Sequence, residues 1–68
     1  MNTGKTNYDL LPCPCCDSRT LTKRGYYEIC DVCDWEDDPV QSADPAYPGG
    51  ANIVSLNEAR KEWLAKTP

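Results

Sequence analysis

Two Cys-x-x-Cys pairs constrain this chain more than any other feature. Cys13 and Cys16 form the first pair, and Cys30 and Cys33 form the second. Each Cys-x-x-Cys segment makes a tight turn that brings its two sulfurs to one side, and the distance between the pairs leaves room for a hairpin. The spacing predicts one structural Zn2+ ion held in a tetrahedron by these four thiolates.

The fifth cysteine, Cys15, has no place in that set. Pro14 follows the first ligand directly, and its fixed φ angle suits the entry to the turn, which favours Cys13 with Cys16 over a pairing through Cys15. Cys15 is either a reactive thiol beside the metal or a packing residue without a chemical role. The sequence shows no electropositive setting for it, which favours the packing role.

A chain of 68 residues without Phe needs a staple, because so small a domain buries little apolar surface. Disulfides are the competing staple and predominate in secreted proteins. No apolar run near the N-terminus resembles a signal peptide and no stretch is suited to a membrane, so we expect a cytoplasmic protein without membrane contact. The odd count of five cysteines then favours reduced thiols and a metal. Iron in a rubredoxin-like electron carrier is the nearest rival to zinc.

The predicted fold is a small metal-stapled α+β fold, zinc-ribbon-like, with two cysteine knuckles, a short antiparallel β-hairpin and a C-terminal amphipathic helix. Residues 1–9 are predicted to be a flexible arm, and residues 10–68 a single domain. Within that domain, residues 12–35 hold the knuckles and hairpin, residues 36–54 a long loop, and residues 55–66 the helix.

Alternating apolar residues predict the two strands at residues 20–23 and 26–29, joined by a turn at residues 24–25, with Tyr27 and Ile29 on one face.

The helix begins with a capping-box pattern in which Ser55 is the N-cap and Glu58 reaches back to it. The residues at helical spacing that are expected to face the ribbon are Leu56, Ala59, Trp63 and Leu64. Trp35 and Trp63 are expected to meet in the small core.

The formal net charge is −4, and four thiolates (−4) with one Zn2+ (+2) make it about −6. Such a chain is repelled by phosphate backbones, so a protein with a basic surface is the more natural partner and nucleic acid is disfavoured. The candidate partner-binding residues lie in the long loop: Glu36, Asp37, Asp38, Asp44, Tyr47 and Asn52. The acidic run is either a solvated loop, with a carboxylate accepting amides near residues 49–50 or pairing with Arg60, or a second site for Ca2+ or Mg2+.

Several short stretches between the first knuckle and the C-terminal helix form a recognisable pattern. They are Pro12-Cys13-Pro14-Cys15-Cys16, Thr20-Leu21, Tyr27-Glu28-Ile29-Cys30, Val32-Cys33, Trp35-Glu36-Asp37-Asp38, Gln41, Gly49-Gly50-Ala51-Asn52 and Ser55-Leu56-Asn57-Glu58-Ala59-Arg60. In these residues the chain resembles the bacterial cysteine-rich CPCC family. This resemblance implies a small zinc-ribbon-like domain of bacterial or phage origin, and it implies little about function. The chain departs from the family pattern at Asp17, where Gly is usual, and at Asp31 and Asp34, where Pro and an aromatic residue are common. Asp tolerates a left-handed conformation less well than Gly.

No catalytic group of residues is visible, since the chain has no His and no recognisable nucleophile motif, so we expect no enzyme. The leading hypothesis is a zinc-stabilised protein-interaction module, such as an immunity protein, an antitoxin or an inhibitor of a larger partner. A nucleic-acid-binding zinc ribbon is the alternative, and a rubredoxin-like electron carrier is the third. The basic residues available for the alternative are Lys5, Arg19, Lys23 and Arg24.

Overall fold

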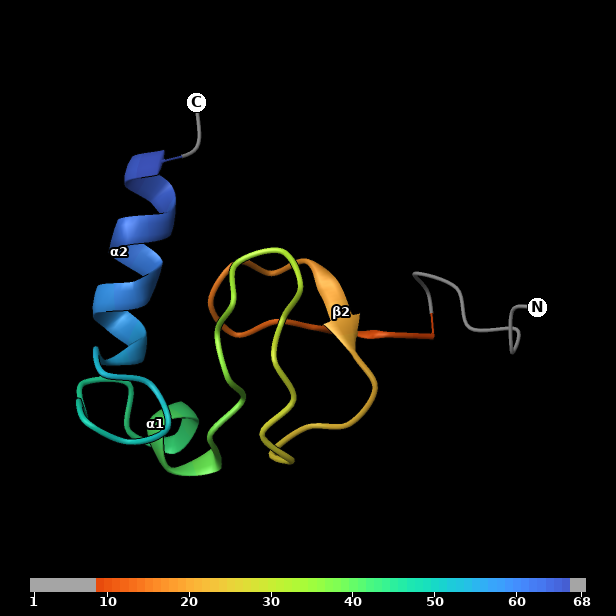
Figure 1. Ribbon diagram of the computed structural model, residues 1–68, viewed down its shortest axis with the longest axis horizontal. Helices are drawn as coiled ribbons and strands as arrows, with labels where there is room; N and C mark the ends of the chain where they lie inside the picture. The colour runs from red at the N-terminus through yellow and green to blue at the C-terminus, as the bar shows by residue number, and fades with distance from the viewer. Residues whose placement is uncertain (1–8, 67–68) are drawn as a thin grey trace.

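The computed structural model describes residues 9–66. Its elements in chain order are β1 (Leu11–Pro12), β2 (Arg19–Leu21), α1 (Pro39–Ala43) and α2 (Leu56–Lys66). The two cysteine knuckles lie side by side in the middle of the molecule, and α2 stands beside them on the side away from the β1/β2 pair (Figure 1). The predicted arm at residues 1–9 falls outside the described part of the chain except for Asp9.

The antiparallel pair of strands encloses the first knuckle. Leu11 pairs with Leu21 and Pro12 with Arg19, with a bulge between the two pairs. Leu21 is fully buried, whereas Arg19 is exposed, so β2 shows the alternation of a half-buried strand. A small zinc-ribbon-like fold with a two-stranded antiparallel hairpin and a C-terminal helix is confirmed.

The hairpin is not the one that the sequence predicted. Residues 26–29 form no strand, and Ile29 makes only an isolated bridge to Glu36. Tyr27 has a φ of 60°, a left-handed conformation that interrupts an extended strand. Each knuckle therefore has its own short pairing across its base, β1 with β2 for the first and Ile29 with Glu36 for the second. Closing each tight turn forces the chain before and after it to run antiparallel, which decides these pairings.

The predicted loop at residues 36–54 contains the helix α1. Asp38 is its N-cap, and its Oδ1 accepts from the N–H groups of Val40 at 2.8 Å and Gln41 at 3.4 Å. Pro39 occupies the first turn, where its missing N–H has no cost. The Asp-Pro pair is a local signal for a helix start, and it was overlooked because the helix has only five residues and no apolar period.

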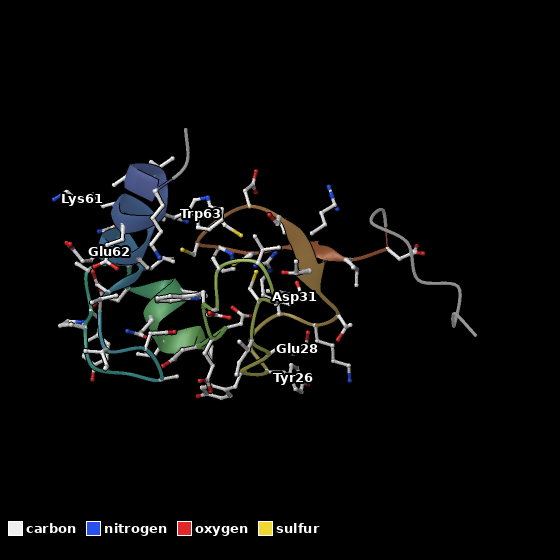
Figure 2. The ribbon with its side chains drawn as sticks, turned by 45° about the horizontal axis from the view of Figure 1, so that its top comes forward. Tyr26, Glu28, Asp31, Lys61, Glu62 and Trp63 are labelled. Atoms are coloured by element: carbon white, nitrogen blue, oxygen red, sulfur yellow. The ribbon has the colours of Figure 1, made fainter. Side chains whose placement is uncertain are left out.

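The second helix, α2, begins as the capping box predicts. Ser55 Oγ accepts from the N–H of Glu58 at 3.1 Å, and Leu56 in the first turn is buried. Leu64 was expected on the same buried face, but it is 71% exposed. Leu56 belongs to the buried cluster and Ala59 packs against it, while Trp63 further along the helix lines a cavity with Trp35. Trp63 lies on the side of α2 that faces the knuckles, and Lys61 points away from them (Figure 2).

The core consists largely of the knuckles themselves. Cys13, Cys30, Trp35 and Leu56 form one buried cluster. The residues packed against this cluster are Cys15, Cys16, Cys33 and Ala59. Trp35 is buried as expected, whereas Trp63 is only partly buried and shares a cavity with it. Because cysteines make up so much of the core, whatever holds the sulfurs also holds the fold.

Candidate metal centre

The two knuckles have the same backbone structure. In each, the carbonyl of the first cysteine, Cys13 or Cys30, accepts from the N–H four residues ahead, and its N–H donates to the carbonyl five residues ahead, at 2.8 to 2.9 Å. The residue four ahead, Asp17 or Asp34, has a φ of 68° or 67°. Asp is among the few residues other than Gly that adopt this left-handed conformation with some frequency. The turn at Asp17, where the family usually has Gly, therefore closes in the same way as the turn at Asp34.

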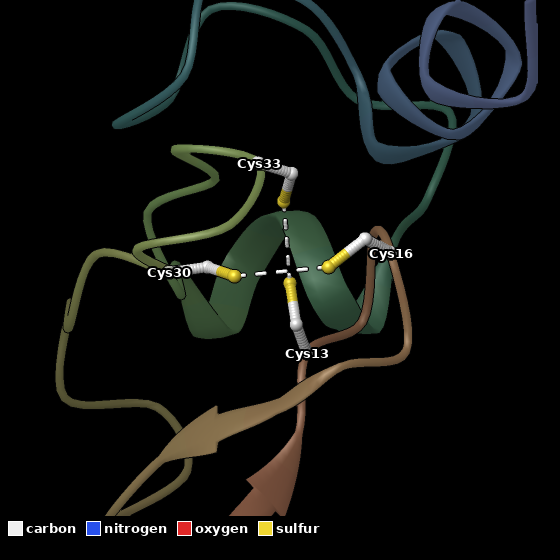
Figure 3. A group of neighbouring side chains, drawn as sticks. All are labelled: Cys13, Cys16, Cys30 and Cys33. Atoms are coloured by element: carbon white, nitrogen blue, oxygen red, sulfur yellow. Dashed lines mark hydrogen bonds between the residues drawn. The ribbon is translucent and has the colours of Figure 1, made fainter. Parts of the chain in front are cut away.

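The four predicted ligand sulfurs come together between the knuckles (Figure 3). Their Sγ atoms all lie within 4.8 Å of one another. Cys13 Sγ is 3.6 Å from Cys33 Sγ, and Cys16 Sγ is 3.7 Å from Cys30 Sγ. A tetrahedron with metal–sulfur bonds of about 2.3 Å has edges of about 3.8 Å, whereas a disulfide bond measures about 2.05 Å. The cysteines are free thiols with the separation that a tetrahedral metal site requires.

Polar hydrogens from nearby groups point at the sulfurs. The N–H groups of Cys15 and Val32 each approach the first sulfur of their own knuckle, Cys13 Sγ and Cys30 Sγ, at 3.4 Å. Thr20 Oγ1 donates to Cys30 Sγ at 3.1 Å. Donors of this kind stabilise thiolates and orient metal ligands. Thr20 carries no sequence signal for this contact, because its place in β2 beneath the second knuckle depends on the tertiary pairing.

Without a metal, the cysteine thiols differ in acidity. Burial alone would raise the pKa of Cys30, but hydrogen bonds from Thr20 and from nearby backbone N–H groups outweigh it and lower that pKa to about 7. Burial raises the pKa of Cys13 to about 11 and also raises that of Cys33. A metal must therefore displace protons from the thiols of Cys13 and Cys33, which resist ionisation. Metal binding consequently releases protons and weakens in acid.

The sequence model for cysteine-rich CPCC proteins matches residues 11–66. That span includes both knuckles and all four clustered cysteines. The chain belongs to the cysteine-rich CPCC family. Among curated proteins, none matches the chain.

The remaining cysteine of this CPCC protein, Cys15, lies inside the first knuckle and packs against the buried cluster. Burial raises the pKa of its thiol, and a hydrogen bond with Cys33 is the largest opposing effect. A reactive cysteine needs a lowered pKa and an electropositive setting. The environment of Cys15 is that of a packing residue.

The acidic run was expected to form a surface loop, and here that expectation is wrong for two of its three carboxylates. Asp37 is 0% and Asp38 is 5% exposed. Asp37 Oδ2 accepts from the N–H of Gly25 at 2.6 Å, and Asp38 Oδ2 accepts from the N–H of Ala51 at 2.9 Å. Hydrogen bonds from the N–H groups of Ala51, Val40 and Gln41 lower the pKa of Asp38, and the bond from Ala51 has the largest effect. Both carboxylates accept from backbone amides of distant segments. The bond from Ala51 to Asp38 agrees with the alternative of one carboxylate accepting amides near residues 49–50, whereas the bond from Gly25 to Asp37 was not expected.

The other predicted partner-binding residues of the CPCC chain are dispersed. Asp44 is exposed at the C-terminal end of α1, and Tyr47 is 44% exposed in the segment that follows. Glu36 is partly buried, and its N–H donates to Asn52 Oδ1 at 2.9 Å. Within residues 9–66, the cysteine quartet is the one group of three or more His, Cys, Asp or Glu side chains close enough to hold a metal ion. The second cation site at the acidic run is therefore not formed there.

Gln41 holds together the segment after α1, which was predicted to be part of a long loop. It is fully buried, and its Nε2 lies 3.1 Å from the carbonyl oxygens of Tyr47, Asn52 and Val54. Its Oε1 accepts from the backbone N–H of Asn52 at 3.0 Å and from Asn52 Nδ2 at 2.9 Å. Gln41 belongs to the residues that carry the family resemblance, and this is a structural reason for its presence.

The two arginines named as candidates for nucleic-acid binding both donate hydrogen bonds within the chain. Arg19 Nη1 donates to the carbonyl of Leu10 at 3.0 Å, and Arg24 Nη2 donates to that of Pro12 at 3.1 Å. The Lys23 ammonium lies 5.1 Å from the centre of the Tyr26 ring. Lys5 falls outside the described residues.

Within residues 9–66, no helix has the length and apolar character needed to cross a bilayer.

Proposed function

We propose that this metal-binding CPCC protein is a zinc-stapled module that binds another protein and has no catalytic activity of its own. The four-sulfur cluster supports a structural role for the metal, because four thiolates leave no open position for water or substrate. Iron fits the same sulfurs, but the buried cluster around them contains a single aromatic ring, Trp35, among the described residues. We propose zinc for that reason, and a reducing compartment such as the cytoplasm because all five thiols are free.

The observation that carries the interaction role is an exposed apolar segment formed by Tyr26, Tyr27, Ile29 and Val32. These side chains are 67%, 51%, 61% and 48% exposed. Exposed apolar residues that are scattered need no explanation, whereas several close together indicate a contact surface. The backbone beneath them is held in place, because Tyr27 N donates to Asp37 O at 3.1 Å and Ile29 is bridged to Glu36. A surface that is already ordered loses little entropy on binding.

Charge indicates the character of the partner. The chain carries a net charge of −4 before any metal thiolates are counted, which favours a basic protein surface. Small acidic proteins that bind a larger basic partner include immunity proteins, antitoxins and inhibitors, and we place this chain in that class. We propose the exposed apolar segment as the contact surface and not the acidic run, because Asp37 and Asp38 are buried.

The test begins with elemental analysis of natively purified protein, where one zinc per chain is expected and one iron would overturn the choice of metal. Affinity capture with the zinc-loaded protein should then identify a partner by mass spectrometry. Capture should fall at least tenfold in a Tyr26→Ser/Ile29→Ser variant. Ile53→Ser is the matched control, because Ile53 is 90% exposed but lies outside the segment. The proposed surface would be refuted if Tyr26→Ser/Ile29→Ser captured as much of the partner as Ile53→Ser does. It would also be refuted if the zinc-loaded protein captured no partner at all.

A further inference from the structure

The cavity that Trp35 and Trp63 share has a volume of about 370 Å³ and lies between α2 and the chain of the second knuckle. Trp63 lies on the side of α2 that faces the knuckles (Figure 2). Trp35 is 3% exposed, whereas Trp63 is partly exposed, so Trp63 is the ring that a ligand in the cavity can contact. Among residues 9–66, no residue of the exposed apolar segment lines this cavity, so the proposed function leaves it unexplained.

Carboxylates line this cavity from both sides. Asp34 and Glu36 belong to the chain of the second knuckle, and Glu62 belongs to α2. Asp34 and Glu62 are exposed and Glu36 is partly exposed, so all three are open to solvent. None of the three carboxylates forms a hydrogen bond or an ion pair within residues 9–66. Lys66 is the one basic residue of the described lining, so three negative charges and one positive charge give a net charge of −2, which attracts a cation.

Hydrogen bonds and packing hold the walls of the cavity in place. Glu36 N–H donates to Asn52 Oδ1 at 2.9 Å, and Asn52 Nδ2 donates to Glu36 O at 2.8 Å. Asn52 is held in turn by the buried side chain of Gln41. On the other wall, Ala59 of α2 packs against the buried cluster. Because the walls are ordered before a ligand arrives, little entropy is lost on binding.

We infer that this cavity binds the side chain of an arginine from the protein partner. The inference rests on the proposed function, which supplies a basic partner, and it specifies one side chain of that partner. A guanidinium group is flat, stacks on aromatic rings and carries five N–H donors. Its flat face lies against Trp63, its N–H groups reach the carboxylates on both sides, and the apolar stem lies against Val54 and Ala59.

Other ligands fit the cavity less well. A Ca2+ ion takes six to eight oxygen ligands and Mg2+ takes six, all around one point. Within residues 9–66, no three carboxylates lie close enough together to share one ion. A lysine ammonium is a compact, strongly hydrated charge with no flat face for Trp63. A larger, planar cation matches carboxylates that are spread over two walls.

The experiment uses the full zinc-loaded chain labelled with 15N. Nα-acetyl-arginine N-methylamide is titrated, with the citrulline analogue as an uncharged probe of the same shape and the lysine analogue as a second cation. The arginine probe should give saturable shifts of the Trp63 Nε1–H and of the amides of Asn52 and Glu62. The citrulline probe should give none, and the lysine probe should bind at least about threefold more weakly. Absence of saturable shifts, or equal shifts with arginine and citrulline, would overturn the inference, and equal affinity for lysine would overturn the choice of arginine.

Variants assign the binding to the ring and the carboxylates. Trp63→Leu keeps an apolar side chain but removes the ring, and it should weaken binding of the arginine probe at least about fivefold. Glu62→Gln changes an exposed side chain and should weaken binding about threefold, which keeps the test available if Trp63→Leu does not fold. Lys66→Gln removes the like charge and should tighten binding about twofold. Unchanged affinity in Trp63→Leu or Glu62→Gln would refute the site.

Two matched controls accompany these variants. Asp31→Asn removes the same charge as Glu62→Gln from an exposed position outside the cavity. Ile53→Ser changes a lining residue that is 90% exposed and leaves the ring and the carboxylates in place. Both should bind the arginine probe within about twofold of the unaltered chain. A loss in Asp31→Asn equal to that in Glu62→Gln would show a general attraction to an acidic chain and would refute the site.

The same variants separate this inference from the proposed function. If the captured partner binds Trp63→Leu and Glu62→Gln as tightly as the unaltered chain, the arginine site is wrong and the interaction role stands. If the arginine probe binds but no partner is captured, the site stands and the interaction role fails.

Discussion

Replacing Gln41 tests whether one buried amide holds the segment between α1 and α2. The side chain is fully buried and bridges Tyr47, Asn52 and Val54. Its Nε2 has two hydrogens for three carbonyl oxygens, so at least one hydrogen is shared, and its Oε1 accepts two further bonds from Asn52. Gln41→Ala removes all of these bonds and leaves their partners without a replacement inside the protein.

The expected cost follows from the number of bonds lost. Two donated and two accepted hydrogen bonds, each worth about 1 kcal/mol net, correspond to roughly 4 kcal/mol. Water reaches part of this segment, because Tyr47 and the neighbouring residues 48–51 are exposed, and it will satisfy some of the freed groups. We therefore expect the free energy of unfolding to fall by about 2–4 kcal/mol, a large share of the 5–15 kcal/mol typical of a domain.

The assay is urea unfolding of the metal-loaded protein at a buffered free-zinc concentration, followed by Trp fluorescence, since stability depends on the metal level. Val40→Ala is the control on the same helix; Val40 is 55% exposed, and its loss should change stability by less than about 0.5 kcal/mol. Gln41→Glu should be at least as destabilising as Gln41→Ala near neutral pH, because an oxygen would then face three carbonyl oxygens. The reasoning would be refuted by a Gln41→Ala cost no larger than that of Val40→Ala.

Four further predictions concern the metal, the knuckle turns, the loop and pH. Removing the metal with a chelator should unfold the chain, because cysteines make up half of its buried cluster and three of the four residues packed against it; an unchanged circular dichroism spectrum and melting temperature would contradict this. Asp17→Gly and Asp34→Gly should each stabilise the protein by about 1 kcal/mol in urea unfolding, because both residues have a positive φ, whereas Asp31→Gly, the control with no positive φ, should not. Gly50→Ala should lower the melting temperature, since the added Cβ would come 2.5 Å from Asp38 Oδ2. An unchanged melting temperature would show that the loop shifts away from Asp38 at little cost. The pKa of Asp38 is lower in the folded chain than its ordinary value of 3.8, so its ionised form contributes stability above that value and the contribution is lost as pH falls through the folded pKa. In a 13C NMR titration the Asp38 carboxyl should stay ionised down to the pH at which the fold is lost, and a midpoint at or above 3.8 would count against the bond from Ala51.

Short-range patterns in the sequence were sufficient for the parts of the protein that depend on neighbours. The spacing of the two Cys-x-x-Cys pairs predicted the sulfur cluster, because each knuckle closes through bonds between residues at most five apart. The start of α2 followed from Ser55 and Glu58 for the same reason. Asp38-Pro39 carried an equally local signal for α1, which was overlooked.

The tertiary structure decided the features that join distant segments. The apolar alternation at Tyr27 and Ile29 predicted a strand, but these side chains are exposed, and the knuckle turns impose a different pairing. The acidic run predicted a charged surface, yet Asp37 and Asp38 turn inward to bind amides more than ten residues away. No periodic pattern encodes such bonds, because they depend on the path of the whole chain. The cysteine spacing alone determined where a metal binds, while folding determined which polar groups were buried around it.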